Sequence, residues 1–283
     1  MVRVGLDKPT QYAVLRDMQR LTLSIQPIVA ALIIVAVGCF SSSSGVHNER
    51  GLLYVEQGAL EKAIREFDKA IEIDQAMAET YNNRGAIYIR LNRYQQALQD
   101  FDKSIELDPG IAEVFNNRGL TLDRLGQFER AIQDFGKAIE IAPTMVEAFN
   151  NRGYGYMYRL EEFRLAIDDF DQAIRLDSYN PAAYTNRGVA YSNLGEYQQA
   201  IDNYDKAIDL DPSSSFTYEF RGAARINLGQ FWEALEDLDQ AILLNPERGS
   251  PYYNRSLANT ETGRDAQASA DKDKACSLDN QFC

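Results

Sequence analysis

The stretch FNNRGLTLDRLGQFERAIQDFGKAIEIAP, from Phe115 to Pro143, contains the pattern that decides the fold. Its arginine belongs to a series whose successive members are 34 residues apart, except for one step of 35. The members are Arg50, Arg84, Arg118, Arg152, Arg187, Arg221 and Arg255. A self-similar period of this length is typical of solenoids, in which each unit packs only on its neighbours. The sequence therefore predicts seven repeated units.

Each copy has the pattern of two amphipathic helices joined by a short turn. In EKAIREFDKAIEI (Glu61 to Ile73) the apolar residues are three and four positions apart, which places them on one helix face. Small residues recur thirteen or fourteen positions after each arginine, and small side chains let helices approach closely. Glycines such as Gly126 mark the turn inside a copy, and prolines such as Pro143 end the second helix.

This pattern resembles the tetratricopeptide repeat, whose signature combines an aromatic residue, a glycine, Ala-x3-Phe and a proline. The matching residues of the third copy are Phe115, Gly119, Ala131, Phe135 and Pro143. The resemblance implies an all-α, right-handed solenoid of about seven 34-residue helix-turn-helix repeats over residues 47–283. It also implies that the first helices line a concave groove and that the last copy is a degenerate cap.

The arginine of each copy replaces a leucine that is usual in the family. An acidic residue follows it by 16 positions, or by 17 in the fourth copy, and only Asn203 breaks the series. The carboxylates are Glu66, Asp100, Asp134, Asp169, Asp237 and Asp271. Because a charge near a packing position must be paired, we expect a ladder of ion pairs with a structural role. We also expect Arg118→Leu, which restores the family residue, to be tolerated.

The asparagine that precedes five of the seven arginines is the main candidate for peptide binding. The resemblance places these residues on the groove side, where they would hold an extended peptide. They are Asn83, Asn117, Asn151, Asn186 and Asn254. A carboxamide donates and accepts hydrogen bonds at once, so it can hold a peptide main chain without recognising its side chains. The alternative is hydrogen bonding between helices of the solenoid.

Two further groups are candidates for the same groove. The acidic candidates are Glu79, Glu113 and Glu147. Together they would attract a basic segment, although a solvated helix face explains them equally well. The single 35-residue step lies between Arg152 and Phe163, where the added residue predicts either a π-bulge or a longer turn. With a bulge, Tyr154 and Tyr158 would form a contact platform; a longer turn would leave them in ordinary packing.

The N-terminal residues 1–38 read as a signal peptide or a membrane anchor. No Asp, Glu, Lys or Arg occurs between Leu21 and Asn48, and Arg16 and Arg20 precede the apolar segment. The small residues before Cys39 are similar to the lipobox of bacterial lipoproteins, which implies cleavage there and a lipid on the cysteine sulfur. An uncleaved transmembrane helix is the alternative. In both cases the positive charges stay inside, so the repeats face the exported side.

A flexible, serine-rich tether is expected over residues 39–46, before the first copy. Near the other end, Cys276 and Cys283 are free to form a disulfide in an oxidising compartment, and two reduced thiols are the alternative.

Composition excludes several classes of function. A formal net charge of -13 argues against nucleic-acid binding. The sole histidine is His47, and the chain has no phosphate loop, metal-spaced cluster or nucleophile motif, so we expect no enzyme, cofactor or metal. The resemblance implies a membrane-tethered scaffold of the bacterial cell envelope that binds neutral or basic peptide segments of partner proteins. The alternative is a structural protein that self-assembles into homo-oligomers.

Overall fold

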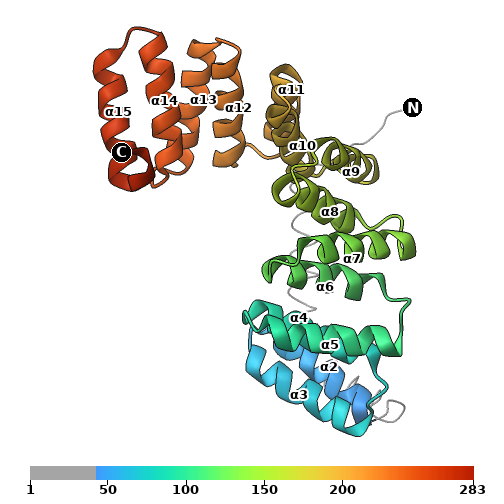
Figure 1. The fold of residues 1–283 in the computed structure, drawn as a ribbon. Coiled ribbons are helices and arrows are strands. Elements are labelled where there is room, and N and C mark those ends of the chain that lie inside the picture. Colours follow the sequence, from blue (N-terminus) through green and yellow to red (C-terminus); the bar gives the residue numbers. More distant parts are fainter. Residues whose placement is uncertain (1–42) are drawn as a thin grey trace, which may run out of the picture. The chain divides into compact units, whose positions relative to one another are not determined.

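The computed structural model describes residues 43–283, which form fourteen α-helices and one short 3₁₀ helix without any strand in that range (Figure 1). The chain divides into two compact units, with the boundary after Leu107. Unit 1 contains α2 (Ser43–Glu56), α3 (Leu60–Ile73), α4 (Ala78–Arg90) and α5 (Tyr94–Leu107). The expectation of an all-α solenoid is confirmed.

Unit 2 contains ten α-helices and the 3₁₀ helix. Its first six are α6 (Ala112–Arg124), α7 (Phe128–Ile141), α8 (Val146–Arg159), α9 (Phe163–Leu176), α10 (Pro181–Asn193) and α11 (Tyr197–Leu210). The others are α12 (Ser215–Asn227), α13 (Phe231–Leu244), α14 (Gly249–Glu261), α15 (Asp265–Leu278) and η1 (Asn280–Phe282). Even-numbered helices are the first helix of each copy, called A helices here, and the odd-numbered α3 to α15 are the second, called B helices.

A close contact between a glycine of the A helix and an aromatic ring of the B helix recurs in the first five copies. A β-carbon on Gly119 of α6 would lie 2.6 Å from Cε1 of Phe135 in α7, so only glycine allows this approach. Phe135 is buried there between Ala131 and Ala138. The same contact recurs between Gly51 and Phe67, Gly85 and Phe101, Gly153 and Phe170, and Gly188 and Tyr204. The glycine that follows the arginine and the aromatic residue 16 or 17 positions later are thus recurring features of one helix-to-helix contact that these copies repeat.

The turns inside the copies need a backbone with positive φ. Five glycines supply it, among them Gly126 with a φ of 75°. Asn92 and Glu161 take the same conformation in the second and fourth copies, at 57° and 55°. Non-glycine residues adopt this region at a cost, and asparagine tolerates it better than glutamate.

The added residue of the fourth copy lengthens α8 rather than changing its type. This helix has 14 residues, whereas the A helices α4, α6, α10, α12 and α14 have 13. The turn that follows, residues 160–162, is as long as the turn at residues 125–127. No π-helix is present in residues 43–283. The expected π-bulge is therefore wrong. The expected longer turn is found in the hydrogen bond that closes it: the N–H of Glu162 donates to the carbonyl oxygen of Tyr156, six residues earlier, whereas Gln127 donates to Leu122, five residues earlier.

Neighbouring copies meet mainly through the B helix of one copy and the A helix of the next, and successive A helices make a smaller contact. In unit 2 each A helix contacts the next one, from α6 to α8 and onward to α14, while no B helix of residues 108–283 contacts the next B helix. The A helices of that unit are therefore on the inner side of the curve and the B helices on the outer side. We call the exposed surface of α6, α8, α10 and α12 the inner row.

The N-terminal boundary of the first helix corrects the expected tether. Helix α2 begins at Ser43, and Ser44 is buried with 1% of its surface exposed, so residues 43–46 belong to the folded unit. The apolar run and Cys39 lie outside the described residues. Within residues 43–283, no helix combines the length and apolarity that crossing a membrane requires.

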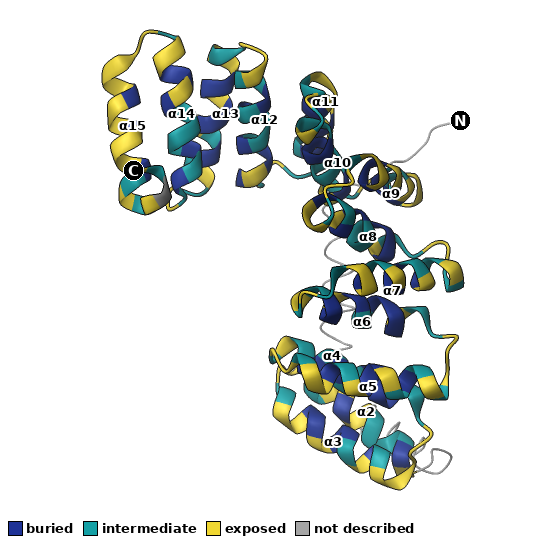
Figure 2. Ribbon diagram, viewed as in Figure 1, coloured by how far each residue is buried: buried dark blue, intermediate teal, exposed yellow. Residues whose placement is uncertain are grey.

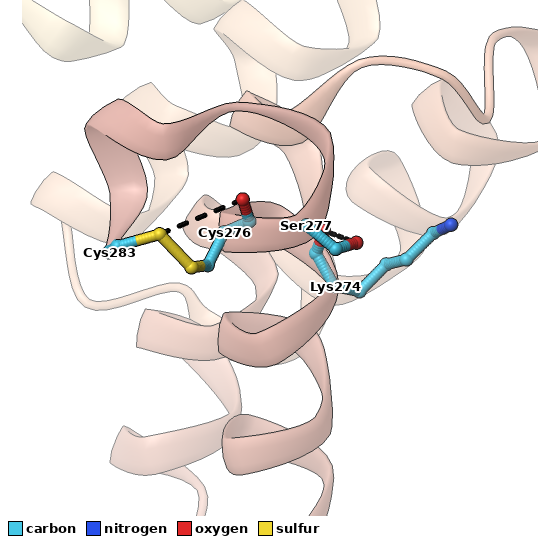
Figure 3. Close-up of a disulfide and its surroundings, with 4 residues drawn as sticks. All are labelled: Lys274, Cys276, Ser277 and Cys283. Atoms are coloured by element: carbon cyan, nitrogen blue, oxygen red, sulfur yellow. Dashed lines mark hydrogen bonds between the residues drawn. A yellow bond between two sulfur atoms is a disulfide. The ribbon is translucent and has the colours of Figure 1, made fainter.

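The C-terminal end of unit 2 has a polar outer surface. Helix α15 is largely exposed (Figure 2), with Lys272 in the place that aromatic residues occupy in other copies. Cys276 and Cys283 form a disulfide (Figure 3). The adjacent Phe282 stacks on Tyr253 of α14, with 5.2 Å between ring centroids. The last copy is thereby closed by its own terminal residues.

Candidate interaction surface

The repeated arginines form the ladder of ion pairs that the sequence predicts. Arg118 donates from Nε and Nη2 to the two carboxylate oxygens of Asp134, at 2.7 and 2.8 Å. The pairs within copies are Arg84 with Asp100, Arg118 with Asp134, Arg152 with Asp169, Arg221 with Asp237, and Arg255 with Asp271. In the fifth copy Arg187 donates instead to the amide oxygen of Asn203, at 2.7 Å.

The first copy differs from this expectation. Glu66 accepts hydrogen bonds from Lys69, at 2.6 Å, and pairs with Nδ1 of His47, at 2.7 Å. Arg50 is exposed and is not the partner of Glu66. The Lys69 hydrogen bond and then the His47 hydrogen bond lower the pKa of Glu66 from its ordinary value. His47 is thus part of a hydrogen-bonded cluster with Glu66 and Lys69.

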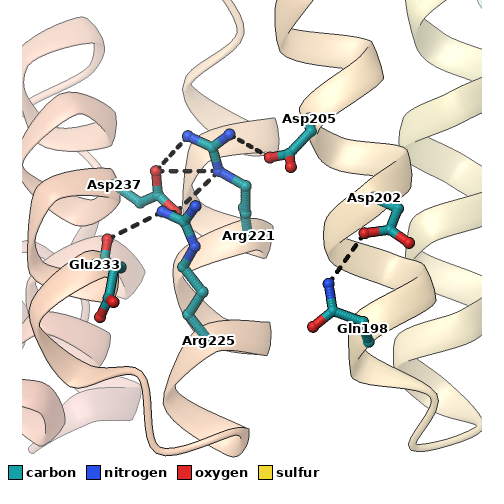
Figure 4. A network of polar contacts seen from close by, with 7 residues as sticks. All are labelled: Gln198, Asp202, Asp205, Arg221, Arg225, Glu233 and Asp237. Atoms are coloured by element: carbon teal, nitrogen blue, oxygen red, sulfur yellow. Dashed lines mark hydrogen bonds and ion pairs between the residues drawn. The ribbon is translucent and has the colours of Figure 1, made fainter.

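Most arginines have a second carboxylate partner that the sequence reasoning missed. Nη1 of Arg221 donates to Asp205, on the B helix of the preceding copy, at 2.5 Å (Figure 4). The same contact joins Arg84 to Asp68, Arg187 to Asp171 and Arg255 to Asp239. Each of these arginines therefore links two B helices that do not otherwise touch. The signal was present in the sequence, since an aspartate precedes each of these arginines by 16 positions.

Burial sets the electrostatics of the ladder. Asp237 has 3% of its surface exposed, and this burial raises its pKa although the Arg221 guanidinium lowers it. Arg225 adds a further contact to the same carboxylate, at 2.8 Å. Asp134 is also buried, with 7% of its surface exposed, so removal of Arg118 would leave a carboxylate without the bidentate partner that offsets its desolvation. The expectation that Arg118→Leu is tolerated must be revised accordingly.

The aromatic residue three positions before each arginine completes the motif. The guanidinium carbon of Arg118 lies 5.6 Å from the centroid of the Phe115 ring, within the range of a cation–π interaction. The same stacking joins Arg84 to Tyr81, Arg152 to Phe149, Arg187 to Tyr184, Arg221 to Tyr218 and Arg255 to Tyr252. In FNNRG, therefore, the aromatic residue, the arginine and the glycine are all structural.

The asparagines between them connect neighbouring A helices. Nδ2 of Asn151 in α8 donates to Oδ1 of the buried Asn116 in α6, at 2.9 Å. In unit 1, Nδ2 of Asn83 donates to Oδ1 of Asn48, at 3.3 Å. The helix-to-helix role is thus present in two copies. Each of these amides still has a second N–H and an oxygen with which it can bind a ligand.

The other predicted groove residues are accessible in different degrees. Asn117 and Asn186 are half-buried on α6 and α10. The acidic candidates Glu79, Glu113 and Glu147 are exposed in the first turns of α4, α6 and α8. The positive end of a helix dipole also favours carboxylates at such places, so their position alone does not assign a ligand.

Tyr154 and Tyr158 come together on the inner row. Their ring centroids are 4.5 Å apart, and 41% and 45% of their surfaces are exposed. Tyr154 lines a pocket of about 230 Å³ between α6 and α8 together with Leu120, Arg124 and Asn151. These residues bring aromatic surface, a cation and an amide to one place.

Arg159 shapes the far side of that pocket. It donates from Nε and Nη2 to the carboxylate of Asp123, at 2.9 and 3.2 Å, and lies 4.8 Å from the ring centroid of Phe128. Its charge is therefore partly neutralised. Among residues 43–283, no group of His, Cys, Asp or Glu side chains has the arrangement of a metal site.

Stacked helix pairs of this geometry define the class of α-solenoid repeat proteins. Models of the tetratricopeptide repeat match residues 78–111, 112–145 and 181–214, and a related TPR repeat model matches residues 51–92. The chain belongs to the tetratricopeptide repeat family. Proteins of this family are generally non-enzymatic scaffolds that bind other proteins. No significant match was found among curated proteins.

Solved structures share the fold at low sequence identity. A tetratricopeptide repeat protein from Parabacteroides merdae has a TM-score of 0.66 and 21% identity, over 84% of this chain and 94% of that chain. PilW, a type IV pilus biogenesis factor, has a TM-score of 0.68 and 20% identity, over 75% and 97%. YrrB, a TPR protein with an unusual peptide-binding site, has a TM-score of 0.54 and 23% identity, over 64% and 94%.

Proposed function

We propose that the protein is a membrane-tethered scaffold of the bacterial cell envelope, and that it binds extended peptide segments of partner proteins on its inner row. The observation that carries the proposal is the pocket between α6 and α8. Asn151 and Tyr154 line it, and Tyr158 stacks beside Tyr154. An amide that can bind a main chain thus lies next to rings that can cover apolar side chains.

The charge of the inner row supports a neutral or basic segment as the ligand. Glu113 and Glu147 are exposed on adjacent A helices, and the whole chain has a net charge of -13. Such a field attracts cationic segments and repels acidic ones at moderate ionic strength. Because the amides contact the main chain, the affinity should depend weakly on the sequence of the segment.

The N-terminal segment supports the tether. Arg16 and Arg20 precede a run from Leu21 to Asn48 that contains no Asp, Glu, Lys or Arg, with Cys39 near its end. A lipid on Cys39, such as a palmitoyl chain, would hold the repeats on the exported side. Retention of the run as a transmembrane helix would give the same orientation.

Photocrosslinking in cells tests peptide binding. A photoreactive amino acid at Asn117, on the middle of α6, should capture a heterologous partner whose band is identified by mass spectrometry. The double variant Glu113→Gln and Glu147→Gln should weaken that band, whereas Glu129→Gln on the B helix α7 should not. Crosslinks only between copies of this chain would instead favour self-assembly and overturn the scaffold proposal.

Metabolic labelling tests the tether. Cells that express the full chain should incorporate radiolabelled palmitate into it, and Cys39→Ser should abolish the label. The control Cys276→Ser with Cys283→Ser should keep it. If the chain is not labelled, membrane fractionation distinguishes two cases. A chain that stays with the membrane is held by a transmembrane helix, and a chain that is released has no tether.

A further inference from the structure

The inner row of unit 2 changes its chemistry between its two halves. The second and last positions of α6 and α8 are Glu113, Arg124, Glu147 and Arg159. The corresponding positions of α10 and α12 are Ala182, Asn193, Phe216 and Asn227. The first half therefore has charges of both signs at these positions, while the second half is uncharged at them. A ligand that follows the row meets two different environments.

The second half contains a pocket of about 280 Å³ between α10 and α12. Its walls include Val189, Tyr197, Phe220 and Ala223, and none of its lining residues is charged. At its base the hydroxyl of Tyr204, which has 1% of its surface exposed, lies 3.1 Å from Oγ of Ser192. The two hydroxyl groups at the base are thus hydrogen-bonded to each other, and most of the other wall atoms are apolar.

Ala223 gives this pocket a small side chain on its α12 side. Ala223 is the ninth residue of α12, and the ninth residues of α6, α8 and α14 are Leu120, Tyr154 and Leu257. Leu120 and Leu257 project from the A helices, with 37% and 40% of their surfaces exposed. Leu120 and Leu257 line pockets of their own, and Ala223 contributes a smaller side chain to the pocket between α10 and α12. Its size is at or below the lower end of small-molecule pockets and suits a single side chain.

The rim of the pocket carries two oriented amides. Nδ2 of Asn193 donates to the carbonyl oxygen of Val189, and Nδ2 of Asn227 donates to that of Ala223, both at 2.9 Å. These bonds to their own helices orient the amides, and each amide retains an oxygen and a second N–H. A peptide main chain crossing the pocket can use both.

A second ring extends the apolar surface beside the pocket. The centroid of Phe216 is 6.3 Å from that of Phe220, and the guanidinium of Arg248 covers Phe216 at 3.7 Å. Arg248 also pairs with the buried Glu219, at 2.5 Å. Its charge is therefore neutralised within the protein and offers little attraction to an acidic ligand.

We infer that the pocket between α10 and α12 binds one leucine or phenylalanine side chain of a partner segment whose main chain lies across Asn193 and Asn227. This inference rests on the proposed function for the presence of such a segment. A lysine, arginine, aspartate or glutamate side chain would lose hydration among uncharged walls without gaining a counter-charge. An apolar side chain loses nothing there and removes its own surface and that of Phe220 from water.

Side-chain analogues test the pocket directly. The probes are N-acetyl-L-phenylalanine amide and N-acetyl-L-leucine amide, with N-acetyl-L-lysine amide for comparison, titrated into the full chain and detected by saturation-transfer NMR. Ala223→Leu places a larger side chain in the pocket wall, and Phe220→Asn replaces an aromatic wall by the residue that Asn117 provides at the corresponding position of α6. Each should weaken binding of both apolar probes by about tenfold. The control Ala266→Leu, on the exposed surface of α15, should leave binding unchanged.

The variants must be folded for the result to count, and melting curves of the three should confirm this. Unchanged binding in both folded pocket variants, or equally tight binding of the lysine probe, would overturn the inference. Photocrosslinking from Asn117 separates this failure from failure of the scaffold proposal. If wild type and Ala223→Leu capture the same partner equally, the scaffold proposal stands and the pocket inference fails. If the probes bind but no partner is captured, the pocket inference stands and the scaffold proposal fails.

Discussion

Nη1 of Arg152 lies 3.6 Å from the point where a β-carbon on Gly136 would stand. The residue 16 positions before the arginine is a carboxylate partner in other copies, as with Asp68, Asp171, Asp205 and Asp239. Arg152 keeps its pair with Asp169 in its own copy. At this place, therefore, α7 and α9 lack the ionic link that joins other successive B helices.

Gly136→Asp should restore that link and stabilise unit 2. The comparison is with Gly136→Asn, which has nearly the same shape and helix propensity but no charge. We expect the aspartate variant to be more stable by about 0.2–1 kcal/mol, the usual range for a partly exposed ion pair. Urea unfolding at low salt measures the difference, which should shrink in 1 M salt because screening weakens it.

The contact geometry leaves room for this change. No atom other than Nη1 of Arg152 comes within 4 Å of the added β-carbon, and 3.6 Å is an ordinary van der Waals distance. Gly136→Ala should also stabilise, by roughly 0.5–1 kcal/mol, because it removes a glycine from a helix interior. If the aspartate variant were no more stable than the asparagine variant at low salt, the ionic link would have no energetic role.

Arg118→Leu should be strongly destabilising, contrary to what the family consensus suggests. Asp134 has 7% of its surface exposed and receives two hydrogen bonds from Arg118. Removal of one partner of such a pair costs about 3–5 kcal/mol, because the remaining charge stays buried. Thermal unfolding should therefore show a large loss of melting temperature for the single variant.

The double variant Arg118→Leu with Asp134→Leu is the matched control. Replacing both charges by apolar residues removes the desolvation penalty, so most of the lost stability should return. A single variant as stable as wild type would show that the Asp134 carboxylate is solvated or protonated at little cost, and the ladder would then be dispensable in this copy.

Local spacing made the ladder within each copy predictable. Arg118 and Asp134 are 16 positions apart, and the corresponding residues of the other copies have the same spacing except in the fourth copy, where it is 17. The helix pattern between the two positions determines which helix faces meet. The second carboxylate, such as Asp205 for Arg221, lies in another copy, and its role depends on how copies stack. The sequence alone does not specify that stacking, so the link between B helices became evident only in the structure.

The same limit explains the errors at Ser43 and in α8. Four serines followed by glycine have low helix propensity, yet Ser44 is buried, so tertiary packing overrides the local preference. In α8, the extra residue adds one helical position, and it lies inside the segment that the hydrogen bond from Glu162 to Tyr156 closes. Spacing reveals that a residue was added but does not say which element absorbs it. For the asparagines, sequence left two roles open, and Asn151 with Asn116 shows one of them.

The cluster of His47, Glu66 and Lys69 should make stability depend on pH. Its hydrogen bonds lower the pKa of Glu66 in the folded state below the ordinary value of 4.5. The stabilisation is therefore fully present above pH 4.5 and is lost as the pH falls through the lower folded-state pKa. The difference in melting temperature between wild type and Glu66→Gln should be constant at neutral pH and vanish in acid. Glu72→Gln, on the exposed face of α3, is the control, and an identical pH profile for both variants would contradict the assignment.

The disulfide between Cys276 and Cys283 should protect the last copy locally. It closes a short loop that holds Phe282 against Tyr253, so its removal frees the terminal residues and exposes that side of α14. In Cys276→Ser with Cys283→Ser, amide hydrogen exchange should accelerate in α14 and α15 and stay unchanged in α6 and α7, because each copy contacts only its neighbours. Tyr253→Ala, which removes the stacking but keeps the disulfide, separates the two contributions. Uniform acceleration along unit 2 would mean that the cap supports the whole unit rather than its own end.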